Sequence, residues 1–393
     1  MKIAFVSTLQ PDTNYFRYLA LALQDLRVDV RVYADRKPQN LEVGLKCVYL
    51  LWSPGDRLYP FHILRQAFRD RPDVVHLHHE VGMFGGPINA SLFPLVPILL
   101  KLFGFKIVTT IHAVVKPAEI DLRFLETFVW PQKAILIFPV KLYFFLLNWV
   151  IAMFSDRVIV HADILKKTLI ENYHCPGEKI LVVPHGVPER VDHPVELSPS
   201  SVWLGGIASG RYLLYFGYLH RRKGLEGLLK AFSTTPAAKE GSVKLVIAGG
   251  ALQKDYDDKL KQLVTELGLS STVVITGFIS QTELRYLLDH CLFVVLPATY
   301  SIAASGPLAQ VIAHEKPVIV SRVGVYAEEI TDGENGLQSL PGNVTDLAEK
   351  IQKLATDENL LIRLGEGMKK MHLKRGWNSI AERTLKIYED IIR

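Results

Sequence analysis

A loop of small residues between two apolar runs is the first place in this sequence where chemistry is expected. Residues 292–296 and 318–320 read as buried parallel strands, and a helix is expected over residues 308–314. Ser305 and Gly306 therefore stand just before a helix N-terminus, where free backbone N–H groups and the helix dipole favour an anion. The same pattern also fits an ordinary strand–turn–helix unit, and this loop alone leaves both interpretations open.

A second loop carries three adjacent cations, Arg221, Arg222 and Lys223. It follows an expected strand over residues 212–216 and precedes an expected helix over residues 224–232. A positive charge is unfavourable at the start of a helix. An anionic partner therefore explains Lys223 better than a solvated surface position does.

Histidines mark the ends of two expected strands in the first half of the chain. His76 and His78 share one face of the strand expected over residues 73–78, His79 lies opposite, and His112 directly follows the strand over residues 107–111. A metal site would need a third convergent ligand, and no such ligand has a predictable spacing. The sequence predicts no metal site here, and packing or substrate contact is the better interpretation.

Alternating strand and helix patterns predict an α/β protein with two doubly wound domains. A chain of 393 residues is too long for one ordinary domain. We expect one domain over residues 1–190, a polar linker over 189–201, a second domain over 191–375, and a last helix over 376–393 that crosses back to the first domain. Ligands bind at the carboxyl ends of parallel strands, so the two edges are expected to face each other across a cleft.

Charge and cysteine usage narrow the class of partner. Lys and Arg number 45 against 40 Asp and Glu, a net charge of +5 that suits nucleotide phosphates or an anionic membrane surface. The basic residues form no clustered stripe, which argues against nucleic acid. Three dispersed cysteines favour a reducing cytosol, and the first ten residues resemble a strand, not a secretory signal.

Two apolar segments, residues 92–106 and 134–154, account for much of the 49% hydrophobic content. The charge-free stretch from residue 142 to 155 is too short to span a bilayer, and Pro139 with Lys141 interrupts a longer version. Three interpretations stay open: core helices of the first domain, a monotopic membrane contact with neighbouring Lys and Arg on lipid phosphates, or a dimer interface.

Several motifs appear in a fixed order along the chain. They are Thr109-Thr110-Ile111-His112, Val182-Val183-Pro184-His185-Gly186-Val187, Phe216-Gly217-Tyr218-Leu219-His220-Arg221-Arg222-Lys223-Gly224, the loop at Ser305 with Glu315-Lys316-Pro317-Val318-Ile319, Val323-Gly324 with Glu328, and Asp332-Gly333-Glu334-Asn335-Gly336-Leu337. Together they resemble the family 4 retaining glycosyltransferases of GT-B fold over nearly the whole chain. The resemblance implies two Rossmann-like domains, with the acceptor on the first and a nucleotide-sugar donor on the second.

The resemblance also implies roles for individual residues. Lys223 would contact the donor diphosphate, Arg221 or Arg222 would supply a second cation with Arg221 preferred, and His112 would contact the sugar through its ring or backbone. The implied catalytic set is His112, Lys223 and Arg221. The implied donor-binding set is Gly217, Tyr218, Arg222, Gly249, Phe278, Ser305, Gly306 and Gln310. The acceptor-side candidates are Gln10, Asn14 and His78.

Three features depart from the family pattern. Tyr218 replaces the arginine that usually follows the loop glycine, Ile302 and Gln310 stand where two glutamates are usual, and residues 8–14 contain no glycine. The Ser305-Gly306-Pro307 run resembles a branch in which Ser-Gly backbone amides hold the donor.

The resemblance implies a retaining glycosyltransferase that moves a sugar from a nucleotide-diphosphate sugar to a glycan, a lipid-linked acceptor or a small polar acceptor. Synthesis of cell-surface polysaccharide or glycolipid is the expected setting, in the cytoplasm or at the inner face of the plasma membrane. No cofactor and no essential metal are expected, because positioned cations can stabilise the leaving phosphate. Two alternatives stay open: a non-catalytic GT-B scaffold subunit at the membrane, and a nucleotide-sugar epimerase, which would need acidic groups for proton transfer.

Overall fold

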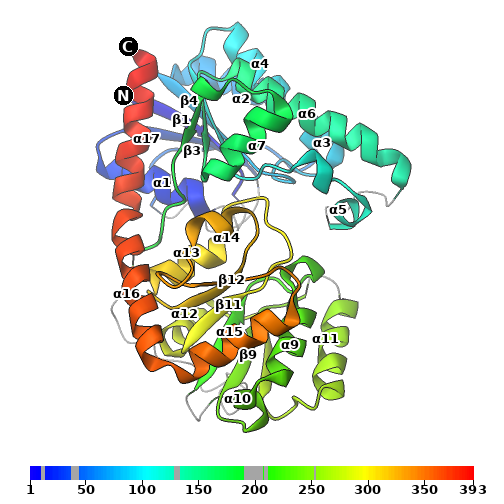
Figure 1. Cartoon of the computed structure of the whole chain (residues 1–393). Helices are drawn as coiled ribbons and strands as arrows, with labels where there is room; N and C mark the ends of the chain where they lie inside the picture. The colour runs from blue at the N-terminus through cyan, green and yellow to red at the C-terminus, as the bar shows by residue number, and fades with distance from the viewer. Residues whose placement is uncertain (10–13, 37–43, 128–132, 190–206, 208–210, 252–253) are drawn as a thin grey trace. The chain divides into compact units, whose positions relative to one another are not determined.

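The computed structural model describes residues 1–9, 14–36, 44–127, 133–189, 207, 211–251 and 254–393 (Figure 1). The chain divides into two compact units. Unit 1 comprises Met1–Gly186, Ile302–Ala304 and Trp377–Arg393, and unit 2 comprises Val187–Ser301 and Ser305–Gly376. The last helix of the chain therefore belongs to the same unit as its first strand. Most of the expected linker over residues 189–201 lies outside the described residues.

Unit 1 contains a seven-stranded sheet in the order β3-β2-β1-β4-β5-β6-β7. Every neighbouring pair is parallel. The strands are β1 (Lys2–Val6), β2 (Asp29–Asp35), β3 (Val48–Trp52), β4 (Val74–His79), β5 (Ile107–Ile111), β6 (Arg157–Val160) and β7 (Ile180–Val182). The chain leaves β1 in one direction and returns to β4 on its other side, so the topological switch point lies between these two strands.

Helices cover both faces of this sheet, as buried apolar strands require. They are α1 (Asn14–Asp25), α2 (Tyr59–Asp70), α3 (Pro87–Ser91), α4 (Leu95–Leu102), α5 (Leu122–Thr127), α6 (Ile137–Phe154), α7 (Asp163–Tyr173) and α17 (Trp377–Ile392), with short 3-10 turns η1 (Pro117–Glu119), η2 (Ala134–Leu136) and η3 (Gly177–Lys179). Helix α17 packs alongside α1, and both contribute to one core with Phe5, Val32 and Ile159 (Figure 1).

Unit 2 contains a six-stranded parallel sheet in the order β10-β9-β8-β11-β12-β13. The strands are β8 (Tyr212–Phe216), β9 (Lys244–Ala248), β10 (Val273–Gly277), β11 (Phe293–Leu296), β12 (Val318–Ser321) and β13 (Leu337–Ser339). The helices are α9 (Leu225–Thr234), α10 (Pro236–Lys239), α11 (Lys254–Glu266), α12 (Gln281–His290), α13 (Gly306–Ala313), α14 (Gly324–Glu329), α15 (Val344–Thr356) and α16 (Glu358–Lys374), with a 3-10 turn η4 (Arg221–Lys223). Its switch point lies between β8 and β11.

These observations confirm the predicted fold class, two doubly wound α/β units. The apolar segment over residues 92–106 contains one helix, α4, and Pro94 stands just before it, whereas α3 ends at Ser91 before this segment begins. The described residues between β5 and η2 contain η1 and α5. The segment Ile302–Ala304 groups with unit 1, because the Val114 N–H donates to the Ile302 carbonyl at 2.9 Å.

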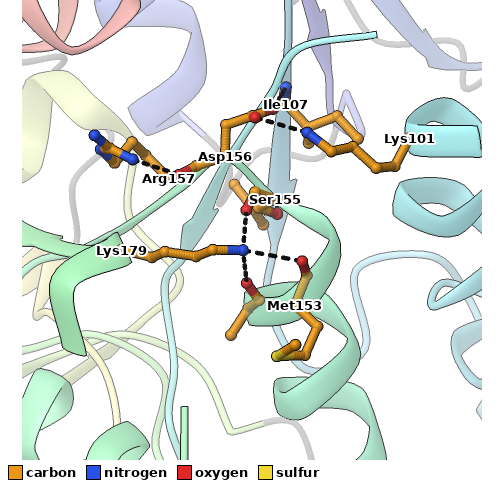
Figure 2. Close-up of polar contacts among 9 residues, drawn as sticks. Lys101, Ile107, Met153, Ser155, Asp156, Arg157 and Lys179 are labelled. Carbon is orange, nitrogen blue, oxygen red and sulfur yellow. Dashed lines mark hydrogen bonds and ion pairs between the residues drawn. The ribbon is translucent and has the colours of Figure 1, made fainter. Parts of the chain in front are cut away.

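The apolar helix α6 is bound to the sheet of unit 1 at its C-terminal end. The Lys179 ammonium donates to the carbonyls of Ala152, Met153 and Ser155 at 3.1, 3.0 and 3.1 Å, so a cation satisfies backbone acceptors at and just beyond the end of the helix (Figure 2). Next to it, Asp156 accepts from Lys101 at 2.6 Å and from the Ile107 N–H at 2.8 Å. The last turn of α6 is therefore fixed against β5 and β6.

Candidate functional site

The loops that follow β8 and β11 meet at the switch point of unit 2. The Thr299 N–H donates to the Arg222 carbonyl at 2.9 Å, which binds the loop after β11 to the cation-bearing turn η4. Gly217 lies at the start of α13 as well, since a Cβ atom built on it would lie 3.8 Å from the Pro307 ring. The predicted cations and the predicted helix N-terminus are thus brought to one edge of one sheet.

Lys223 is a largely desolvated cation in this edge. Burial, together with the neighbouring Arg222 charge, lowers its pKa to about 8. Within the described part of the chain, its ammonium group has no hydrogen bond and no ion pair. The adjacent Gly224 is left-handed, with φ 73°, and a Cβ there would lie 2.0 Å from the Pro297 carbonyl oxygen, so the turn is tightly packed. An unneutralised, half-buried ammonium at a helix start indicates an anionic ligand.

Arg222 and Arg221 lie in different environments. Burial raises the pKa of Tyr326 to about 12, and both its Ser305 hydrogen bond and the nearby Arg222 charge act in the opposite direction. Arg222 is therefore close enough to influence Tyr326, which lies 2.9 Å from Ser305. The Arg221 guanidinium instead lies over the Tyr256 ring at 5.9 Å, and Arg221 lines a cavity of 180 Å³ together with Gly224, Pro297 and Thr299. Arg222 thus lies on the Tyr326 side of this turn and Arg221 on the Tyr256 side.

Two glycines let the backbone close up beside this turn. Gly217 and Gly249 directly follow β8 and β9, with φ values of 123° and 143°. A Cβ on Gly249 would lie 2.0 Å from the Gly217 carbonyl oxygen, which no side chain can tolerate without backbone movement. Because neither glycine has a side chain, only backbone atoms line this part of the carboxyl edge.

Two aromatic side chains stand exposed at this edge. Phe278 is 71% exposed and its ring meets that of Tyr218 edge to face, with centroids 6.3 Å apart. A Cβ built on Gly250 would lie 2.2 Å from the Phe278 ring, so the ring rests on bare backbone. The exposed face of one such ring offers an apolar surface on which a base could stack.

The N-terminus of α13 offers few free donors. Ser305 is the N-cap: its hydroxyl accepts from the Leu308 N–H at 3.1 Å and also lies 2.9 Å from the Tyr326 hydroxyl. Pro307 has no N–H. The Gly306 N–H makes no hydrogen bond within the described residues, so backbone amides, and not the serine hydroxyl, remain for an anion. Gln310 lies one turn further along α13 and is half-buried.

Histidines gather at the carboxyl edge of unit 1. His78 lies near the end of β4, His112 and His161 directly follow β5 and β6, and His185 lies three residues after β7. The Tyr15 ring packs over three of them, at 4.9 Å from His112, 4.7 Å from His161 and 5.0 Å from His185.

Three of these rings are hydrogen-bonded in series. His78 Nδ1 lies 3.1 Å from His112 Nε2, His112 Nδ1 lies 3.0 Å from His161 Nε2, and His161 Nδ1 lies 3.0 Å from the Val183 carbonyl. Burial lowers the pKa of His78 and of His112 well below the usual value for histidine, with the neighbouring imidazoles adding to the effect. Both ring nitrogens of His112 are thus engaged inside unit 1, and its backbone N–H donates to the His79 carbonyl at 2.9 Å.

The remaining histidines of β4 have other roles. His76 bonds the hydroxyls of Tyr388 and Thr110 at 2.5 and 2.7 Å, and burial lowers its pKa to about 3. His79 packs on Phe93, and burial lowers its pKa to about 4. The described residues contain no group of three or more His, Cys, Asp or Glu side chains that could hold a metal ion.

Sequence reasoning singled out His78 and His112 but missed His161 and His185. The available signal was a repeated pattern, since four apolar strands of the first half each end in, or are soon followed by, a histidine. Of the other acceptor-side predictions, Gln10 lies outside the described residues and Asn14 begins α1.

Similar proteins agree with this architecture. A model of "Glycosyltransferase Family 4" matches residues 13–190, and one of "Glycosyl transferases group 1" matches residues 207–371. Among solved structures, HepE of Anabaena, crystallised with UDP, has a TM-score of 0.75 at 18% identity and covers 99% of this chain and 100% of its own. Sucrose-phosphate synthase of Thermosynechococcus elongatus also has a TM-score of 0.75 at 18% identity, covering 100% and 99%.

Curated relatives match over a shorter length. An uncharacterised glycosyltransferase of Methanocaldococcus jannaschii is 27% identical over 245 residues, which is 60% of this chain and 60% of the relative. A D-inositol 3-phosphate glycosyltransferase of Arthrobacter is 27% identical over 60% of this chain and 55% of its own length. The match thus spans little more than half of these relatives. With the two family models covering both units and the shared fold, the chain belongs to the family 4 glycosyltransferases of GT-B fold.

Proposed function

We propose that this protein is a retaining glycosyltransferase that takes a sugar from a nucleotide-diphosphate donor bound by unit 2. The observation that carries the proposal is Lys223, a desolvated ammonium without a partner in the described residues, at the switch point of the unit 2 sheet. Solved structures of HepE that contain UDP and UDP-glucose support a donor of this chemical class.

The proposed chemistry follows from charge. When the bond between the sugar and the phosphate breaks, negative charge grows on the leaving diphosphate. Lys223 and Arg222 are fixed cations, and the Gly306 N–H is a fixed dipole, so they can stabilise that charge without reorganising at the moment of reaction. We propose that the leaving phosphate itself takes the proton of the acceptor hydroxyl, which removes the need for a carboxylate at Ile302 or Gln310.

We propose that no metal ion is required. The two cations are positioned to neutralise the diphosphate, a task that a divalent ion performs in other transferases. Turnover should therefore survive chelation by EDTA. Loss of turnover with EDTA and its return with magnesium would remove this part of the proposal.

We propose further that the protein binds its acceptor at the cytoplasmic face of a membrane. Helices α2, α4 and α6 pack side by side in unit 1. They expose large apolar side chains along this face: Phe61, Phe68, Leu102, Phe103, Phe138, Leu142, Leu146, Trp149 and Met153. Exposed basic residues, among them Arg65, Arg69 and Lys106, lie on or beside the same helices. This combination suits a lipid interface with anionic headgroups.

The segment Ala134–Phe154 has a mean hydropathy of 2.0 and is long enough, by length and composition, to cross a bilayer. Its C-terminal turn is nevertheless bound to the sheet by Lys179 (Figure 2). In addition, Val140, Phe144, Leu147 and Ile151 are buried in unit 1. A helix with one face buried against its own domain is better placed to lie in an interface than to span it.

The donor proposal is tested by thermal-shift screening with nucleotide sugars, followed by transfer from a labelled donor to a membrane lipid extract. A bound donor must raise the melting temperature by mass action. Stabilisation followed by transfer of the label to lipid or glycan would support the proposal. Stabilisation by no nucleotide and no transfer would favour the non-catalytic scaffold.

The membrane proposal is tested by sedimentation with vesicles, with and without anionic lipid. The double variant Phe138→Glu, Leu142→Glu should lose vesicle binding, because two charges would enter the apolar face. The matched control Ile362→Glu, Leu373→Glu changes two residues of α16 in unit 2 that are 67% and 77% exposed. Equal vesicle binding by both variants would contradict a contact through α6.

A further inference from the structure

The serial hydrogen bonds of His78, His112 and His161 have a fixed direction. A carbonyl oxygen can only accept a hydrogen bond, so the proton of His161 must be on Nδ1, which faces the Val183 carbonyl. The other nitrogen of a neutral imidazole is an acceptor. His161 Nε2 therefore accepts from His112, and the proton of His112 is also on Nδ1.

The proton position of His78 follows in the same way. His112 Nε2 is an acceptor and lies 3.1 Å from His78 Nδ1, which must then carry the proton of His78. This assignment requires neutral rings. His78 and His112 are buried, have no ion pair within the described residues, and are packed among other imidazoles, all of which oppose a positive charge.

The series ends in an unused lone pair. His78 Nε2 is buried and has no hydrogen-bond partner among the described residues. Ser7 follows β1, whose register with β4 runs from Ile3 opposite Val74 to Val6 opposite Leu77, so Ser7 comes opposite His78. The Ser7 hydroxyl is also buried and has no partner among the described residues. A buried acceptor at the end of β4 and a buried hydroxyl just after β1 thus both stand at the switch point of the unit 1 sheet.

We propose that His78 Nε2 and Ser7 Oγ form a binding point for a sugar or polyol hydroxyl, and that His161 is its positioning residue. Through the Val183 carbonyl, His161 fixes the tautomers of His112 and His78. His78 then presents a lone pair, which selects a ligand that donates a hydrogen bond. The identification of this ligand as the transferase acceptor rests on the proposed function, whereas the tautomer assignment does not.

The tautomers are measured directly by nitrogen-15 NMR of histidine-labelled protein at pH 7, with each ring assigned by single substitution. All three rings should be neutral and protonated on Nδ1, and the Nε2 resonance of His78 should have the position of a nitrogen without a hydrogen. A proton on Nε2 of His78 or His112, or an imidazolium at either ring, would overturn the proposal. This measurement needs no substrate, so it stands apart from the test of transfer.

Two substitutions separate positioning from packing. His161→Gln keeps a donor for the Val183 carbonyl and an acceptor for His112, so the Nδ1–H state of His112 and His78 should survive. His161→Phe keeps a ring but removes both nitrogens, so a second tautomer should appear at His112 and His78. Identical His78 spectra in the two variants, both folded by thermal melting, would show that His161 does not position His78.

The ligand is tested with glycerol, as the smallest polyol, and with octyl glucoside, as a glycolipid mimic. Either probe should shift the His78 Nε2 resonance, and Ser7→Ala should weaken this effect several-fold while the His76 resonances stay unchanged. If neither probe shifts His78 Nε2 in a protein that still binds a nucleotide sugar, the hydroxyl site is wrong and the donor site stands.

Discussion

The carboxyl edges of the two sheets differ in the charge of the side chains that they carry. In unit 2 the edge carries an ammonium whose pKa is lowered to about 8, an arginine beside it and a helix N-terminus with an open N–H. In unit 1 the corresponding edge carries buried imidazoles that are hydrogen-bonded to one another and to a backbone carbonyl. Similar strand topology thus supports a charged edge in one unit and a neutral edge in the other.

This difference indicates which ligand each unit can hold. Fixed cations in a desolvated place favour a polyanion, for which charge is the main source of affinity. Neutral imidazoles discriminate by the direction of hydrogen bonds and add little charge. A nucleotide diphosphate suits the first edge and an uncharged hydroxyl suits the second. The predictions below change pH or single residues so that the two edges respond differently.

The largest expected effect is acid destabilisation through unit 1. The folded-state pKa values of His76 and His79 are about 3 and about 4, and those of His78 and His112 are also lowered. The unfolded chain has pKa values of about 6.5, so below that pH it binds more protons than the folded state. Stability should therefore fall by roughly 1 kcal/mol for each of His76 and His79 between pH 7 and 5.5, and His78 and His112 should add to this loss in the same direction.

Tryptophan fluorescence in urea measures this loss, because the Trp377 ring lies 5.1 Å from Tyr15 and reports on unit 1. The unfolding midpoint should move to lower urea at pH 5.5. A midpoint that is unchanged between pH 7 and pH 5.5 would mean that the imidazoles are solvated. The assignment of a neutral, buried edge to unit 1 would then be wrong.

Gly249→Ala should be the most damaging single change at the charged edge. Its Cβ would lie 2.0 Å from the Gly217 carbonyl oxygen, so β8 and β9 must separate at their ends. We expect a loss of at least about 3 kcal/mol in unfolding free energy. Gly268→Ala is the matched control: its φ is also positive, at 69°, but no atom lies within 4 Å of the new Cβ, so about 1 kcal/mol is expected. Equal losses would show that the close contact is unimportant.

Lys223→Ala should weaken the binding of a nucleoside diphosphate by roughly 1.5–3 kcal/mol, as for a hydrogen bond to a charged group. Isothermal calorimetry with UDP and GDP gives the change. Lys230→Ala removes an exposed lysine from the adjacent helix α9 and should leave affinity within about 0.5 kcal/mol of the original. Unchanged affinity in the Lys223 variant would remove the anion site from this edge.

The same lysine predicts a smaller effect of alkaline pH. The ammonium form binds phosphate and is lost as pH rises through about 8, its folded-state pKa. The affinity for a diphosphate should therefore fall about tenfold from pH 7 to pH 9, and the fall should be absent in Lys223→Met. A decline of equal size in both proteins would assign it to another group.

Phe278→Ala should have the smallest effect, about 1 kcal/mol of nucleotide affinity, through loss of an exposed stacking surface. Comparison of UDP with inorganic diphosphate separates base from phosphate contact. The loss should appear for UDP and be absent for diphosphate. A loss shared by both would mean that Phe278 supports the backbone loop instead of the base.

Much of this arrangement could be predicted from the sequence. Apolar runs and helical patterns gave both sheets, and the resemblance of ordered motifs gave the family. Lys223, Ser305 and Gly306 were placed at one edge because the carboxyl ends of parallel strands share an edge. These predictions depend on local patterns and on a topology rule.

The rest depends on contacts that no local pattern encodes. The resemblance admits Arg221 or Arg222 as the second cation, with Arg221 preferred, and the choice depends on side-chain contacts: Arg221 lies over Tyr256, and Arg222 lies near Tyr326. The contact of Gly249 with Gly217 joins the ends of β8 and β9, between which the chain forms η4, α9 and α10. His161 was missed because its role depends on its hydrogen bonds to another imidazole and to a carbonyl, and these partners are distant in the sequence.

Helix α6 is held to unit 1 along its length. Lys179 binds the carbonyls at its C-terminal end, Val140 and Phe144 are buried, and the Tyr143 hydroxyl donates to the Ala90 carbonyl at 3.0 Å. Among the large apolar side chains of this segment, only Ile135 and Phe138, near its N-terminal end, reach 78% and 73% exposure. A force on these two side chains would therefore be distributed over many contacts before it reached His161, which follows β6, so contact with a soft surface need not disturb the imidazoles.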